Sequence, residues 1–197
     1  MLVVDGVRMN NAIFRAGNLQ NVISIDVSAL ESTEILFGPG AVMYGSDAIG
    51  GVMDFHTIKP RFADTSSKLL ITGNSFGRYS SANTEKSGHL DFNIGLKKWA
   101  FVSSITYSDY DDLRTGSDGN SYFLRPSYQE TVNGVDTQIV NSDPQLLVHS
   151  GYSQINGMQK IRFKPNESWD VDYAFHHSAT SDAPRYDRLY LDANKDG

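Results

Sequence analysis

Apolar and polar residues alternate one by one along several stretches of this chain. Between His89 and Leu96, apolar side chains occupy every second position, and polar residues or glycine fill the positions between them. Because successive side chains of a β-strand point to opposite faces, this period of two predicts a strand with one apolar face. Comparable patterns, with the turn signals that bound them, predict strands at 67–79, 87–96, 99–109, 151–164 and 168–180.

Two architectures contain antiparallel strands of this kind. In a soluble β-sandwich the polar face meets water, and in a membrane β-barrel the apolar face meets lipid. Very short turns are predicted at Lys97-Lys98 and within Lys164–Ser168, whereas a medium loop is expected near Ser80–Lys86 and a long one from Asp109 to Ser150. Short turns at one end and long loops at the other are typical of outer-membrane barrels, so the sequence favours the barrel.

The distribution of apolar residues agrees with a barrel. No apolar run approaches the roughly 20 residues that a transmembrane helix needs. A membrane barrel instead places its lipid-facing residues at alternate positions, which leaves little hydropathy signal. Trp99 and Trp169 each begin a predicted strand beside a short turn, where the aromatic girdle of such a barrel would lie.

A glycine-rich connector lies upstream of these strands. Residues 38–55, GPGAVMYGSDAIGGVMDF, contain five glycines and one proline. Glycine reaches backbone conformations that strain other residues, and proline fixes its own φ, so the segment predicts tight turns around a very short helix. Its apolar side chains give it a side to bury and favour a rigid connector; they are Val42, Met43, Tyr44, Ile49 and Val52.

The connector and the strands beside it resemble a known domain. The segment Val3–Arg8 (VVDGVR), the strand Leu30–Ile35 and the GPG and YGSDAIGGV pieces follow one another as in the C-terminal half of the plug domain of TonB-dependent outer-membrane receptors. The segment Ser181–Leu189 also looks like the sequence that follows the same barrel strand in haem- and cobalamin-type receptors. The resemblance is closest to receptors of the haem, cobalamin and siderophore type.

This resemblance implies a mostly β fold in two parts. Residues 1–60 would form the C-terminal half of a partial α+β plug domain, and residues 61–197 the first, about five, antiparallel strands of an up-and-down transmembrane β-barrel. Since the chain starts within a plug strand at Met1 and stops within a loop at Gly197, it is expected to be a fragment of a longer receptor. The implied location is the outer membrane of a Gram-negative cell.

The resemblance also implies active uptake of a scarce, bulky ligand: an iron–siderophore, haem or cobalamin. The implied partners are the TonB energy-transducing complex, that small-molecule ligand and outer-membrane lipid. The segment after Arg8 corresponds to an apical loop, whose side chains suit a ligand with carboxylate or amide edges and an apolar face. The ligand-binding candidates are Asn10, Asn11, Phe14 and Arg15. Alternatively, Arg8 and Arg15 pair with acidic groups of the barrel wall and hold the plug in place.

Other functions stay open at this point. One is a non-transporting outer-membrane barrel or surface protein, such as a sensor or an adhesin, and another is a non-functional truncated gene product. A TonB-recognition segment upstream would indicate transport. An additional N-terminal signalling domain would indicate sensing.

The composition excludes several kinds of chemistry. The chain has no cysteine, which removes thiolate metal sites and cysteine nucleophiles. Its 17 basic and 23 acidic residues give a net charge of −6, and no basic stripe is present, so no nucleic-acid partner is expected. Because no catalytic triad, phosphate loop or carboxylate pair can be recognised, the chain is predicted not to be an enzyme and to need no resident cofactor.

The last residues match part of a calcium loop. Asp192, Asn194 and Asp196, followed by Gly197, give the first half of the pattern D-x-N-x-D-G. In such a loop, oxygens at alternate positions surround the cation and the glycine permits the turn. Calcium is therefore the one metal that the sequence suggests, and a solvated acidic loop is the alternative.

Overall fold

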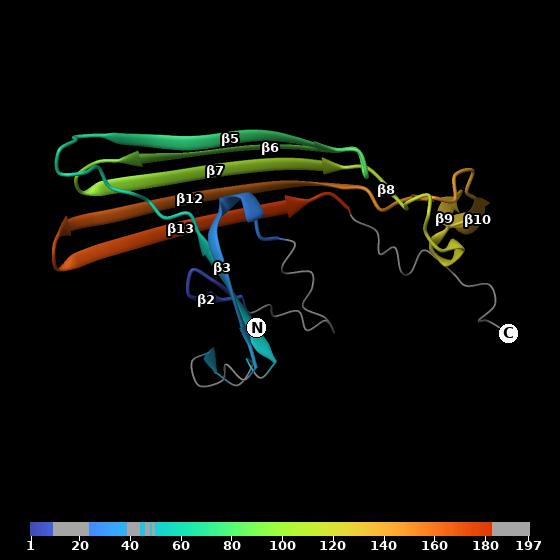
Figure 1. The fold of residues 1–197 in the computed structure, drawn as a ribbon, viewed down its shortest axis with the longest axis horizontal. Coiled ribbons are helices and arrows are strands. Elements are labelled where there is room, and N and C mark those ends of the chain that lie inside the picture. Colours follow the sequence, from blue (N-terminus) through green and yellow to red (C-terminus); the bar gives the residue numbers. More distant parts are fainter. Residues whose placement is uncertain (10–23, 39–43, 46–47, 49, 183–197) are drawn as a thin grey trace. The chain divides into compact units, whose positions relative to one another are not determined.

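The computed structural model describes residues 1–9, 24–38, 44–45, 48 and 50–182 (Figure 1). The chain divides into two compact units. The first consists of Met1–Phe76, His89–Thr106 and Ile155–Ala179, and the second of Gly77–Gly88, Tyr107–Gln154 and the segment from Thr180. Within the described residues, no helix has the length and apolar character needed to cross a membrane.

A four-stranded N-terminal sheet belongs to the first unit. Its order is β2-β1-β4-β3, with bounds β1 Leu2–Val4, β2 Val7–Arg8, β3 Leu30–Phe37 and β4 Gly51–Thr57. β1 runs antiparallel to β2 and parallel to β4, and β3 runs antiparallel to β4. A short 3-10 helix, η1 (Val27–Ala29), leads into β3. The predicted strand Leu30–Ile35 is confirmed, whereas the segment Val3–Arg8 contains two short strands, β1 and β2, that are joined by a turn.

Local sequence explains how this sheet is built. The hairpin β1–β2 turns at Asp5 and Gly6, whose φ angles of 49° and 80° are both positive, as a tight hairpin turn requires. Val3 and Val52 are almost fully buried beside Ala48, and Met1 and Tyr44 pack against them. Burying a side chain such as valine contributes roughly 1.5–3 kcal/mol, so this small cluster holds β1 onto β4.

The predicted five strands form one long sheet, in the order β13-β12-β7-β6-β5. The arrows in Figure 1 alternate in direction, which makes the sheet antiparallel. The bounds are β5 Leu70–Ser80, β6 Glu85–Gly95, β7 Trp99–Tyr110, β12 Tyr152–Asn166 and β13 Trp169–Thr180. The largest difference from the prediction is at the start of β5, which was expected at 67. β12 also continues through Asn166, so the turn before β13 is shorter than the predicted Lys164–Ser168.

The two faces of the long sheet have opposite polarity, and the polar face is the buried one. Its buried polar side chains come from three strands: His89, Asp91 and Asn93 of β6, Ser104, Thr106 and Ser108 of β7, and Gln154, Asn156 and Lys160 of β12. Large apolar side chains are exposed at the positions between them and along β13: Leu90, Phe92, Ile105, Tyr107, Ile155, Trp169, Val171, Tyr173 and Phe175. A water-soluble sheet would bury the apolar set.

The segment between β7 and β12 contains structure that the interpretation as a plain long loop missed. β9 (Ser127–Val132) and β10 (Val135–Val140) form an antiparallel hairpin. Its turn is Asn133-Gly134, with φ angles of 51° and 80°. This dipeptide between two strands is a strong hairpin signal, because both residues must adopt positive φ. β8 (Leu113–Arg114) and β11 (Leu146–Leu147) pair at the base of the segment, and η3 (Ser121–Phe123) lies between β8 and β9.

Gly51 has to be glycine. Its φ is +132°, and a Cβ added to it would lie 2.7 Å from the carbonyl oxygen of Leu36 on β3. We therefore expect Gly51→Ala to lower the free energy of unfolding by more than about 1 kcal/mol. The adjacent change Gly50→Ala is the matched control, because no atom lies within 4 Å of a Cβ built there. Urea unfolding of the two variants measures the difference, and equal losses would contradict this explanation.

Candidate functional site

The residues predicted to bind a ligand or a metal lie outside the described residues. This applies to Asn10, Asn11, Phe14 and Arg15, and to the calcium candidates Asp192, Asn194 and Asp196. Over residues 1–182, apart from the gaps given above, no group of three or more histidine and acidic side chains is arranged to hold a metal ion. The polar cluster that the structure does describe lies within the first unit, where the N-terminal sheet meets the buried face of the long sheet.

Asp5 is the centre of the first contact. Its carboxylate accepts hydrogen bonds from the backbone N–H of Thr57 (2.9 Å, at Oδ1) and from the Thr57 hydroxyl (2.6 Å, at Oδ2). Lys160 of β12 places its Nζ 2.8 Å from Asp5 Oδ2 and 3.5 Å from the Thr57 carbonyl oxygen. His176 of β13 lies at the edge of the group, with Nε2 3.8 Å from Asp5 Oδ2. One carboxylate of the N-terminal sheet therefore meets a cation of the long sheet.

The electrostatics of this contact favour the ionised carboxylate. Burial opposes ionisation of Asp5, but the hydrogen bonds from Lys160 and Thr57 and the charge of Lys160 outweigh it, so the pKa of Asp5 lies below its ordinary value. The side chain of Lys160 is only 8% exposed. A buried ammonium group needs such a partner, because an unpaired charge at this position would be strongly unfavourable.

Asp26 makes the second contact, just before η1. Its Oδ1 accepts a hydrogen bond from the Ser28 N–H (2.9 Å) and caps the short helix. Its Oδ2 accepts a hydrogen bond from the Thr106 hydroxyl of β7 (2.7 Å). The same hydroxyl oxygen lies 2.7 Å from Nδ1 of His89, and Nε2 of His89 lies 3.1 Å from Oδ2 of Asp91. These groups form a continuous polar chain from η1 to β6.

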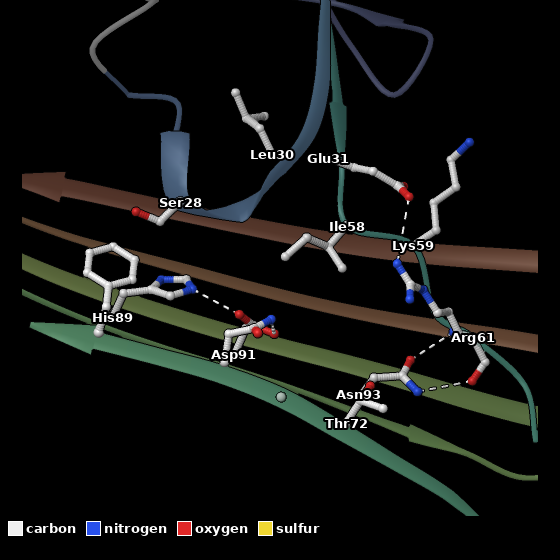
Figure 2. Close-up of a pocket in the computed structure, with 13 residues that line it drawn as sticks. Ser28, Leu30, Glu31, Ile58, Lys59, Arg61, Thr72, His89, Asp91 and Asn93 are labelled. Carbon is white, nitrogen blue, oxygen red and sulfur yellow. Dashed lines mark hydrogen bonds and ion pairs between the residues drawn. The ribbon is translucent and has the colours of Figure 1, made fainter.

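A cavity of about 500 Å³ adjoins this chain (Figure 2). His89 and Asp91 line one side of it and point toward each other. On the other side, the Arg61 N–H donates to Asn93 Oδ1 (2.8 Å), and Asn93 Nδ2 donates to the Arg61 carbonyl oxygen (3.1 Å). Glu31 lies 3.9 Å from the Arg61 guanidinium. The segment after β4 is therefore fixed to β6 by its backbone, while the cavity beside it is lined by charged and amide groups.

The sequence held a signal for these residues that was not used. His89, Asp91 and Asn93 occupy the positions opposite the apolar face of β6. If that apolar face meets lipid, the opposite face must be covered by polar partners, because buried polar groups are almost always hydrogen-bonded. The alternation therefore identifies which face is covered, although it does not identify the partners.

Comparison with known proteins agrees with this two-part structure. Residues 1–52 match the family model of the TonB-dependent receptor plug domain. In this part the chain is similar to the plug domains of TonB-dependent receptors. The matched residues contain β1, β2, η1, β3 and the start of β4, and the long sheet follows them in the chain. The division of the chain at residue 60 stays a prediction.

Several curated relatives are named as receptors or transporters. The vitamin B12 transporter BtuB of Vibrio vulnificus (strain YJ016) is 36% identical over 125 residues, which cover 62% of this chain and 19% of that protein. The hemin receptor of Yersinia enterocolitica is 32% identical over 53% of this chain and 14% of its own length. The rhizobactin receptor of Rhizobium meliloti (strain 1021) is 26% identical over 90% of this chain and 22% of its own length. The chain thus spans less than a quarter of the length of these relatives.

The Asp5–Lys160 pair is expected to stabilise the packing of the plug against the long sheet. Lys160→Met leaves the Asp5 carboxylate without its cation, so we expect a loss of about 3–5 kcal/mol in the free energy of unfolding. Lys164→Met is the control on the same strand, because Lys164 pairs with the almost fully exposed Glu167. For Lys164→Met we expect a loss of about 0–1 kcal/mol in the free energy of unfolding. Urea unfolding in detergent measures both, and a loss at Lys160 no larger than that at Lys164 would argue against a stabilising pair.

The contribution of Asp5 is also expected to depend on pH. Since the pKa of Asp5 is lower in the folded protein, its stabilisation is fully present above the unfolded-state pKa, about 3.9, and is lost as the pH falls through the lower folded-state value. The wild-type protein should therefore exceed Asp5→Asn in stability above about pH 4, and the difference should shrink below it. Asp118→Asn, at an exposed position of the second unit, controls for the loss of one negative charge. A difference that stays constant on acidification would contradict this expectation.

Proposed function

We propose that the protein containing this chain takes up a scarce, bulky ligand, namely an iron–siderophore, haem or cobalamin, across the outer membrane, with energy supplied through TonB. The observation that carries the proposal is the inverted long sheet, whose polar face is buried and whose apolar face is exposed. A plug domain together with such a sheet suits a filled membrane channel. The relatives described above as a vitamin B12 transporter, a hemin receptor and a rhizobactin receptor support this class of ligand.

In this proposal the long sheet supplies the first strands of an up-and-down transmembrane barrel. Its exposed leucine, isoleucine, valine and aromatic side chains would contact lipid. Trp99 lies beside the short turn between β6 and β7, and its ring stacks on Phe163 with a centroid separation of 4.0 Å. Trp169 is 63% exposed beside the turn between β12 and β13. Such aromatic groups suit the interface between lipid and water.

The ligand would be bound on the outer side, at the apical loop of the plug. Asn10, Asn11, Phe14 and Arg15 are the proposed contacts, because amide, guanidinium and aromatic groups suit a ligand with polar edges and an apolar face. Calcium at Asp192, Asn194 and Asp196 is a further proposal, which rests on the spacing of their oxygens alone. The protein would bind and transport its ligand without catalysing a reaction.

Uptake in cells tests this proposal. The full-length protein, produced in cells that lack their own receptors for these ligands, is expected to give accumulation of labelled cobalamin, haem or a ferric siderophore only when TonB is present. Phe14→Ala should raise the half-saturating concentration about tenfold, which corresponds to 1.4 kcal/mol of binding free energy. Val27→Ala, at an exposed position of η1, is the control and should leave the half-saturating concentration unchanged.

The other outcomes separate the alternatives. Ligand binding with a transcriptional response but without accumulation would indicate a sensor. Adhesion to a surface without binding of any of the three ligands would indicate an adhesin. Accumulation that is equal with and without TonB would contradict energised transport.

A further inference from the structure

The polar chain between η1 and β6 consists of three consecutive hydrogen bonds. They join Asp26 Oδ2 to Thr106 Oγ1 (2.7 Å), Thr106 Oγ1 to His89 Nδ1 (2.7 Å), and His89 Nε2 to Asp91 Oδ2 (3.1 Å). All four residues belong to the first unit. The side chains of His89 and Asp91 are 2% and 9% exposed, so water has little access to complete or replace these bonds.

The number of protons that these three hydrogen bonds require determines the charge of the groups that they join. Each of the three bonds needs one proton. The Thr106 hydroxyl supplies one and a neutral imidazole supplies one, while ionised carboxylates supply none. Keeping all three bonds at once therefore requires a third proton, which gives the group of Asp26, His89 and Asp91 a charge of −1 instead of −2. Imidazole is the most basic of the three groups, so the imidazolium form of His89 satisfies the count.

We infer that the contact between η1 and the long sheet is a proton-dependent clamp, in which His89 holds the Thr106 hydroxyl in the orientation that binds Asp26. In the protonated form, both ring nitrogens of His89 donate. Thr106 then has its own proton free for Asp26. Without the additional proton, the bond from Thr106 to Asp26 survives only in the tautomer in which Nε2 of His89 faces the Asp91 carboxylate as a second acceptor.

Loss of that proton leaves no arrangement that keeps all three bonds. If the remaining ring proton stays on Nδ1, then Nε2 and the Asp91 carboxylate face each other as two acceptors, and that contact opens. If it moves to Nε2, then Nδ1 must accept the Thr106 proton, and the bond from Thr106 to Asp26 is lost. In either case a buried acceptor is left without a donor, which is unfavourable. By linkage, pulling Asp26 away from Thr106 also favours release of the proton.

The other charged groups near His89 come from few elements. Asp91 lies on β6 beside it, Asp26 precedes η1, and Glu31 belongs to β3. The segment after β4 contributes Lys59 and Arg61 to the same cavity. β5 contributes Asn74, which donates to Asp91 (3.4 Å), and Phe76, which stacks on His89 at 5.0 Å. Further along the same two strands, Arg78 of β5 lies 3.4 Å from Glu85 of β6.

Spin labelling of η1 tests the clamp directly. Val27 is 78% exposed, and the chain contains no cysteine, so Val27→Cys provides a single labelling position within it. In the full-length receptor in detergent, we expect the mobile fraction of the label to rise several-fold between about pH 5 and about pH 9, a range that spans the titration of ordinary imidazole. A mobility that does not change over this range would overturn the inference.

Matched variants separate the clamp from other titrations. Thr106→Ser keeps the hydroxyl and should keep the pH dependence of the label's mobility. Thr106→Val removes the hydroxyl and should leave the label mobile at every pH. His89→Gln cannot titrate and should also abolish the dependence; an unchanged profile in this variant would overturn the inference.

Nitrogen NMR of wild-type protein labelled at histidine gives an independent measurement that requires no variant to fold. Both ring nitrogens of His89 should be protonated at the acidic end of the range, and one of them at the alkaline end. A neutral imidazole at the acidic end would also overturn the inference.

Discussion

The polarity of the long sheet determines most of the remaining structure. Its apolar side chains are exposed, and its buried face carries amide, hydroxyl, carboxylate, imidazole and ammonium groups. Such groups are costly to bury without partners, and apolar side chains are costly to leave in water. Contact with lipid would remove the cost of the exposed apolar side chains. Hydrogen bonds from a polar domain remove the cost of the buried polar groups. The plug is therefore part of what makes the inner face of this sheet stable, in addition to filling the space beside it.

The two contacts between the plug and the long sheet use the same kinds of polar group. In each, an aspartate accepts a hydrogen bond from a threonine hydroxyl: Asp5 from Thr57, beside Lys160 of the long sheet, and Asp26 from Thr106, whose hydroxyl oxygen also contacts His89. Aspartate and threonine have few rotamers to lose, so ordering them costs little conformational entropy. Directional polar bonds also break over short displacements, whereas apolar packing yields gradually.

Much of this fold could be predicted from the sequence, because local patterns determine it. The alternation around Leu90 and Phe92 indicated both the strand and its apolar face, and Lys97-Lys98 indicated the hairpin. The β9–β10 hairpin was missed although Asn133-Gly134 signalled it, because the segment was treated as one long loop. The clamp could not be predicted, since Asp26 and Thr106 are 80 residues apart and no local pattern pairs them. Asn10, Asn11, Phe14 and Arg15 stay predictions, because they lie outside the described residues.

The position of β1 also has a consequence for the order in which the plug assembles. β1 comes first in the chain, yet it lies between β2 and β4, and its pairing with β4 is parallel. The amino group of Met1 donates to the Gly51 carbonyl oxygen across 50 residues. Parallel pairing requires a long crossover, and closing so long a loop costs entropy before any contact is gained. β1 must therefore wait for β4 to be synthesised, and β3 and β4 can pair before β1 joins them.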